Sequence, residues 1–164
     1  MYYRFGKVFH FLSIMFFILV FIYIYSSVPE TVAYEIDDQG IMVKGFSRNS
    51  FFYVGIVIFA VLNISLALPA KMIEKQSTAN LKRLFPIGDK FRDYMLTWIF
   101  SFIGIVNVSL CILTLFVHSI NNQNEISSSS FSGFFYMVPI LFVTWIVALF
   151  WILSQKFKTL QHGT

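Results

Sequence analysis

Cysteine, histidine and charged residues are all scarce in this chain of 164 residues. A single cysteine, Cys111, excludes an internal disulfide and any metal site built from several cysteines. The three histidines, His10, His118 and His162, lie far apart and lack the spacing of metal ligands. Charged residues make up 12% of the sequence, about half the share usual in soluble domains. The sequence therefore predicts no metal and no other cofactor.

Apolar residues dominate instead, at 57% of the chain, with 21 phenylalanines and a mean hydropathy of +0.73. Such a composition is typical of an integral membrane protein. A chain of this length holds about four spans of ~20 residues with short connections. We therefore expect residues 1–164 to form a single membrane domain.

Four apolar stretches without Asp, Glu, Lys or Arg are long enough to cross a bilayer, and they cover residues 8–28, 51–70, 94–118 and 133–154. Unbroken runs of this length favour helices over the alternating strands of a membrane barrel. The first run is too long and too aromatic for a usual signal peptide, so we expect it to be retained. The predicted fold is an all-α membrane protein, a bundle of four transmembrane helices.

The basic residues indicate the orientation of this bundle. Threading four spans puts ten of the twelve on one side: Arg4, Lys7, Lys71, Lys75, Lys82, Arg83, Lys90, Arg92, Lys156 and Lys158. Short loops rich in Lys and Arg stay in the cytoplasm. Both termini, the loop 71–92 and the tail 155–164 are therefore expected inside, with segment 29–50 and loop 119–132 outside.

Small and weakly polar residues recur every three or four positions along the third span: Thr97, Ser101, Gly104, Asn107, Cys111 and Thr114. This spacing places them on one helix face, where small residues let membrane helices pack closely. Asn63 in the second span is the expected partner of Asn107. The fourth span offers Thr144 and Ala148, whereas the first, poor in small residues after Ser13, is expected at the lipid-exposed edge. The alternative is that these residues line a polar path.

His10 and His118 are both expected near helix ends, where an interfacial histidine needs no special role. The net charge of +4 reflects the basic loop 71–92, so nucleic acid is not an expected partner. The basic residues of this loop, together with several apolar ones, predict a short helix that lies on anionic lipid headgroups. Docking to an acidic protein is the alternative. The residues expected at the headgroups are Lys71, Lys75, Lys82, Arg83, Lys90 and Arg92.

The outer segment 29–50 has two β-prone runs on either side of Asp37-Asp38-Gln39-Gly40. This pattern predicts a β-hairpin with Gly40 at a positive φ. A structured cap would offer a contact surface, with Glu35, Asp37, Asp38 and Gly40 as candidate residues. A plain connection between two helices is the alternative.

The same segment carries a resemblance through three short stretches: Val28-Pro29-Glu30-Thr31-Val32, Asp37-Asp38-Gln39-Gly40 and Gly45-Phe46-Ser47-Arg48. About 25 residues here resemble the segment between the first two helices of SdpI-type (DUF1648) membrane proteins. The resemblance implies a bacterial cytoplasmic membrane protein and, from its best-known relatives, immunity to a secreted toxic peptide or signalling to a membrane-sequestered repressor. The chain departs from the pattern at Glu35, where the family has histidine, at Ala33, where it has proline, and at Met42-Val43, where it has Pro-Asp. Pro29, Gly40 and Gly45 match as structural positions.

No nucleophile with a base, no phosphate-binding glycine loop and no converging carboxylate pair is found in the sequence. We therefore expect a non-enzymatic protein that works by lateral or loop contacts with a membrane-protein partner or a second copy. It would be an immunity or signalling protein, or an accessory subunit of a larger complex. The alternative is a small transporter or channel-like carrier with a wet interior at Asn63 and Asn107.

Overall fold

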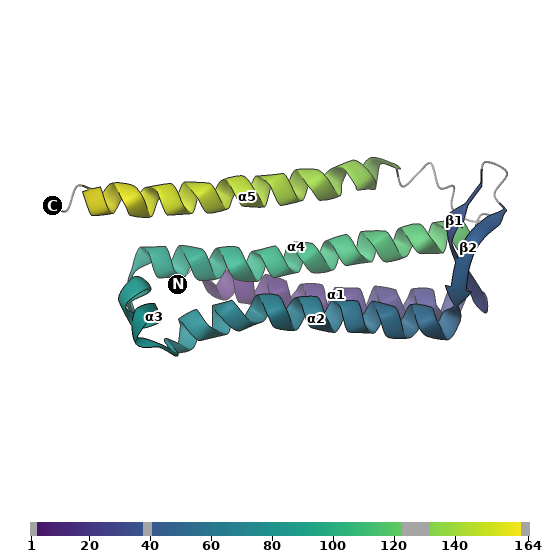
Figure 1. Cartoon of the computed structure of the whole chain (residues 1–164), viewed down its shortest axis with the longest axis horizontal. Helices are drawn as coiled ribbons and strands as arrows, with labels where there is room; N and C mark the ends of the chain where they lie inside the picture. Colours follow the sequence, from purple (N-terminus) through teal and green to yellow (C-terminus); the bar gives the residue numbers. More distant parts are fainter. Residues whose placement is uncertain (1–2, 38–40, 123–131, 162–164) are drawn as a thin grey trace.

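The computed structural model describes residues 3–37, 41–122 and 132–161, and within them it forms an elongated helical bundle (Figure 1). The long helices are α1 (Tyr3–Ser27), α2 (Arg48–Lys75), α4 (Lys90–Asn121) and α5 (Ser132–Gln161). A short helix α3 (Ala79–Leu84) closes one end, and an antiparallel pair, β1 (Thr31–Ile36) and β2 (Met42–Ser47), covers the other. Each long helix is apolar enough to cross a membrane. The predicted four-helix membrane fold with a hairpin is confirmed.

Every long helix extends beyond the predicted span, because polar residues at the ends continue the helical turns. Ser47 caps α2 by accepting a hydrogen bond from the Ser50 amide at 3.1 Å, and Asp89 caps α4 by accepting one from the Phe91 amide at 2.9 Å. At its other end α2 stops where Gln76 adopts a left-handed conformation, φ 51°. Caps of this kind set the boundaries that hydropathy alone does not show.

Helix α4 is the centre of the bundle, with α1 and α2 on one side and α5 on the other (Figure 1). In the most apolar stretch of each helix, 61% of the residues of α4 are buried, against 22% in α1, 11% in α2 and 6% in α5. The peripheral helix is therefore α5.

The prediction that the first span lies at the lipid-exposed edge is wrong. Helix α1 packs along α4 with one narrow face, on which Gly6, Ser13, Phe17, Phe21 and Ile24 are buried. A Cβ atom on Gly6 would lie 3.0 Å from the Thr97 carbonyl oxygen, so the two backbones approach closely there. The small residues Gly6 and Ser13 lie on this face, and Phe11 and Leu12 between them are exposed.

Helix α5 docks on α4 through aromatic side chains. The Trp98 indole donates a hydrogen bond to the Trp145 carbonyl at 2.7 Å, and the Trp145 indole donates one to the Ser101 hydroxyl at 3.0 Å. The expected packing side of the fourth span is wrong for Thr144, which is exposed and bonds its own helix at Ile140, while Ala148 is half-buried. Trp145, one position further along, occupies the contact instead.

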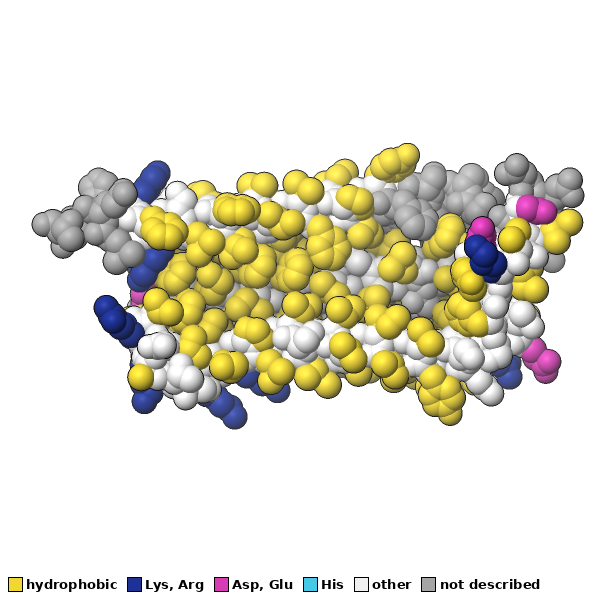
Figure 2. All heavy atoms as spheres, in the orientation of Figure 1, with side chains coloured by type: hydrophobic (Ala, Val, Ile, Leu, Met, Phe, Trp, Pro, Cys, Tyr) yellow, Lys and Arg dark blue, Asp and Glu magenta, His cyan; other side chains and the backbone are white. Residues whose placement is uncertain are grey.

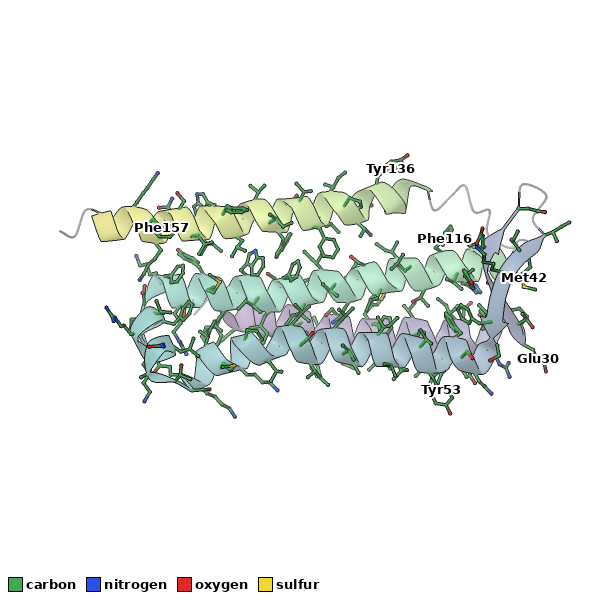
Figure 3. The ribbon with its side chains drawn as sticks, in the orientation of Figure 1. Glu30, Met42, Tyr53, Phe116, Tyr136 and Phe157 are labelled. Atoms are coloured by element: carbon green, nitrogen blue, oxygen red, sulfur yellow. The ribbon has the colours of Figure 1, made fainter. Side chains whose placement is uncertain are left out.

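The two ends of the bundle differ in charge, and apolar side chains cover the surface between them (Figure 2). We call the end that holds α3 and the start of α4 the basic end, and the end covered by β1 and β2 the hairpin end. The described N-terminal and C-terminal residues both lie at the basic end (Figure 1). Tyr53 on α2 and Tyr136 on α5 point away from the bundle (Figure 3), with 68% and 74% of their surfaces exposed. Outward aromatic residues near helix ends suit a membrane interface.

Candidate functional site

A cluster of four polar side chains lies inside the bundle where α1, α2 and α4 meet; we call His10, Ser13, Asn63 and Asn107 the polar cluster. The Asn63 amide donates to the Asn107 carbonyl oxygen at 2.8 Å, and the Asn107 amide donates back to Asn63 at 3.1 Å. Asn107 also donates to the Ser13 hydroxyl at 2.9 Å. The predicted contact between Asn63 and Asn107 is therefore present, and a third helix joins it.

The remaining groups of the polar cluster are also paired. The second N–H of Asn63 donates to the Phe59 carbonyl at 2.9 Å, and the Ser13 hydroxyl donates to the His10 carbonyl at 2.7 Å. His10 Nε2 lies 3.2 Å from the Asn63 side-chain oxygen. That oxygen accepts, so His10 Nε2 is the donor of this hydrogen bond. The polar cluster is thus a hydrogen-bond network that joins α1, α2 and α4.

Sequence reasoning missed His10 and Ser13 as partners of the asparagines. The predicted span began at Val8, which put His10 at the interface, but α1 begins at Tyr3 and carries His10 about two turns into the helix. The spacing of three between His10 and Ser13 places both on one helix face, and this signal was present in the sequence. His118 is buried, with Nδ1 3.3 Å from the Ser27 hydroxyl, rather than simply interfacial.

The other predicted packing residues of α4 also lie at helix contacts. Gly104 faces Phe9 of α1, where a Cβ atom would lie 2.4 Å from the ring, and Cys111 packs among Phe17 and Phe21. Thr114 is buried with its hydroxyl donating to Leu110 of its own helix at 2.7 Å. Ser101 receives the Trp145 indole of α5, so this face of α4 serves two neighbouring helices.

The hairpin is clamped onto the end of α4 by the side chain of Asn121. Its amide oxygen accepts from the Ala33 backbone N–H, and its amide nitrogen donates to the Ala33 carbonyl, both at 2.8 Å. Val32 is fully buried in the core beside Ile24 and Val28. The hairpin therefore packs as part of the bundle rather than as a loose connection.

Glycine is required at position 45 because β2 passes very close to β1 there. A Cβ atom on Gly45 would lie 2.9 Å from the Val32 carbonyl oxygen and 2.8 Å from the Met42 sulfur. Gly45 pairs with Ala33 in the register of the hairpin, next to the point where Asn121 holds it. Gly45 therefore has a structural role in the hairpin.

The predicted contact residues of the hairpin have different environments. Glu35 pairs across the strands with Lys44 at 2.6 Å, and this hydrogen bond raises the pKa of the Lys44 amine. Asp37 closes the turn by accepting a hydrogen bond from the Ile41 amide at 2.8 Å. Asp38 and Gly40 lie outside the described residues. Around the Glu35–Lys44 pair, Tyr34, Met42 and Val43 expose 46%, 50% and 54% of their surfaces.

At the basic end, five of the six predicted headgroup residues are exposed: Lys71, Lys75, Lys82, Arg83 and Lys90. The prediction for Arg92 is wrong, because this side chain is 9% exposed and donates to the Glu74 carbonyl at 3.1 Å. That carbonyl belongs to the last turn of α2, where a cation is favourable. The Glu74 carboxylate pairs with Lys7 of α1. Arg92 and Lys7 thus hold helix ends together.

Among the residues that the structure describes, no three His, Cys, Asp or Glu side chains gather as metal ligands. The arrangement offers a hairpin clamped to α4, a hydrogen-bonded polar cluster and an exposed basic end. The chain is a multi-pass membrane protein by the length and hydropathy of its helices. Comparison with known proteins gave no matching family model, no similar curated protein and no similar solved structure.

Proposed function

We propose that this protein is non-catalytic and acts by contact, through the outward surface of its hairpin, on a partner protein at the outer face of the membrane. The observation that carries the proposal is the combination of a clamped backbone with exposed apolar side chains. Asn121 fixes the hairpin on α4 and Val32 is buried in the core of the bundle, while Tyr34, Met42 and Val43 remain exposed around an ion pair. Figure 3 shows Met42 at the outer edge of the hairpin end.

A surface of this kind suits protein recognition for two reasons. A hairpin already fixed in one conformation loses little conformational entropy on binding. Exposed apolar side chains beside a charged pair supply burial at the centre and polar contacts at the rim. The hairpin surface, defined as Tyr34, Glu35, Met42, Val43 and Lys44, is accordingly the expected contact region.

The alternative of a small transporter or channel-like carrier is less well supported. A conduit needs polar groups that face a passage. In the polar cluster, both asparagines and Ser13 spend their hydrogen bonds on one another and on nearby backbone. This supports a role in holding α1, α2 and α4 together.

We propose a bacterial cytoplasmic membrane as the location, with both termini inside. The resemblance in the hairpin segment favours immunity to a secreted peptide or signalling to a membrane-sequestered repressor, and a role as an accessory subunit is the other contact function that fits. Immunity to a secreted peptide and an accessory role at the outer face both place the partner against the hairpin surface, so one experiment addresses these two together.

Site-specific photocrosslinking in native membranes tests the proposal. A photoreactive amino acid at Val43 should give a discrete crosslinked product, and one at Ile87, which is 79% exposed at the basic end, should not give the same product. Untagged wild-type chain should compete for the partner and reduce the amount of crosslinked product. Untagged chain with the Val43→Glu change should not reduce it. Identical products from both positions, or none from Val43, would contradict the proposal.

A further inference from the structure

A groove of about 580 Å³ lies between α4 and α5 at the basic end of the bundle. Its lining includes Asp89, Lys90, Phe91 and Tyr94 from the start of α4, and Trp151 and Lys156 from α5. The volume lies within the range of small-molecule sites in proteins. This groove belongs neither to the hairpin surface nor to the polar cluster.

The polar end of the groove carries an excess of positive charge, from two lysines against one aspartate. Lys156 Nζ lies 2.7 Å from the Asp89 carboxylate and 5.2 Å from the centre of the Phe91 ring. The hydrogen bond from Lys156 holds the pKa of Asp89 below its usual value, so the carboxylate stays ionised. Lys90 is exposed at the first turn of α4. The lining therefore has a formal net charge of +1.

Apart from Gln155, next to Lys156 in the chain, the rest of the groove is lined by aromatic and apolar residues and leads from this polar end toward the middle of the bundle. Tyr94 lies one turn deeper than Lys90 along α4, and Trp151 lies more than one turn deeper than Lys156 along α5. Both rings stay open to the surroundings, with 40% and 58% of their surfaces exposed. In a helix pair that spans a membrane, such a groove opens sideways into the lipid.

We propose that this groove binds one anionic phospholipid of the surrounding leaflet. The phosphate group would lie at Lys90 and Lys156, and the acyl chains would run past Tyr94 and Trp151 into the bilayer. The argument is charge complementarity on a graded surface: cations stand at the headgroup level, an amphipathic indole lies below them, and apolar side chains follow. A soluble anion would use the cations but not the apolar depth of the groove.

Quenching of Trp151 by brominated lipid in reconstituted vesicles measures this binding. The full chain is placed in phosphatidylcholine vesicles that contain increasing fractions of dibrominated phosphatidylglycerol, and dibrominated phosphatidylcholine gives the reference. The Trp151→Phe variant gives the fluorescence of Trp98 and Trp145 alone, and this is subtracted from the fluorescence of the wild type to leave that of Trp151. We expect stronger quenching of Trp151 by the anionic lipid than by the neutral one.

Charge variants make the test specific to the groove. Lys90→Gln should lower the preference for the anionic lipid about fivefold, the effect of one basic residue near the surface. Asp89→Asn keeps a helix-capping side chain and should raise the preference, because it removes the competing carboxylate. The matched control is Lys82→Gln, which makes the same charge change on α3, outside the groove.

Several results would overturn the proposal. No preference in the wild type would exclude a lipid site at Trp151. An equal loss in the Lys82→Gln and Lys90→Gln variants would show general attraction to a charged surface. A decrease in the Asp89→Asn variant would show that the carboxylate supports binding rather than opposing it. Relief of the quenching by added inorganic phosphate would assign the lysines to a soluble anion.

Discussion

Replacing Asn63 and Asn107 with leucine, singly and together, provides the sharpest energetic test of the polar cluster. Leucine keeps the branched shape of asparagine and removes the amide. The Asn107→Leu change deletes three interhelical hydrogen bonds, two to Asn63 and one to Ser13. At ~0.6 to 1 kcal/mol for each interhelical bond in a membrane, we expect a loss of about 2 to 3 kcal/mol. Asn63→Leu deletes the same two bonds and the one to His10, with a similar loss.

The double variant should lose less than the sum of the single variants, because the two bonds between the asparagines are counted in both. We therefore expect a coupling energy of about 1 to 2 kcal/mol in the cycle.

Unfolding in mixed micelles with increasing denaturing detergent, followed by tryptophan emission, gives the four free energies of unfolding. A control cycle pairs Asn107→Leu with Ser65→Ala, since Ser65 is exposed and bonds its own helix at Leu62. The reasoning would be refuted if the loss of unfolding free energy in the double variant equalled the sum of the two single losses to within about 0.5 kcal/mol, because uncoupled sites behave in that way.

Three further predictions concern the hairpin and the ends of the bundle. Asn121→Leu should release β1 from α4, so hydrogen exchange of residues 31–36 should accelerate while that of the helices is unchanged; equal protection in the variant would show that Asn121 is no clamp. Gly45→Ala should destabilise the hairpin by about 1 to 3 kcal/mol, because the added Cβ would meet the Val32 carbonyl oxygen. The control is Gly133→Ala, whose Cβ would meet nothing within 4 Å. The rates of proteolysis of the hairpin compare the two variants, and similar rates would contradict the prediction. The pKa of Asp89 is lower in the folded protein than its usual 3.8, so its pairing stabilises the fold above that pH and the stabilisation is lost as the pH falls through the folded value. Trp151 emission should therefore change in strongly acidic buffer in the wild type, and an identical change in the Asp89→Asn variant would exclude this ion pair as the cause.

The sequence predicted the features that depend on local chemistry. Unbroken apolar runs identified the four spans, and the Asp37–Gly40 turn between β-prone segments identified the hairpin. The three- and four-residue spacing on α4 led directly to the contact of Asn63 with Asn107. These patterns work because a membrane excludes unpaired polar groups and rewards small residues at helix contacts.

The errors arose where tertiary contacts override the local pattern. Arg92 lies in a basic segment that predicted a contact with lipid headgroups. In the structure its side chain instead donates to the Glu74 carbonyl in the last turn of α2. Helix α1 looked lipid-facing because its buried face is narrow, and the roles of Gly6 and Ser13 depend on how α4 packs against it. Asn121 gave no signal as a clamp, since its partner Ala33 lies 88 residues away.

Quantitative affinity purification from native membranes tests the contact function most directly. The tagged wild type is compared with a hairpin variant, Met42→Ser with Val43→Ser, and with the cluster variant Asn63→Leu with Asn107→Leu, after each is matched for membrane level. We predict a stoichiometric partner with the wild type and the cluster variant, and its loss from the hairpin variant. A partner that still purifies with the hairpin variant would contradict the proposed contact function. A wild type that purifies without a partner, together with a solute flux that is lost only in the cluster variant, would also contradict it.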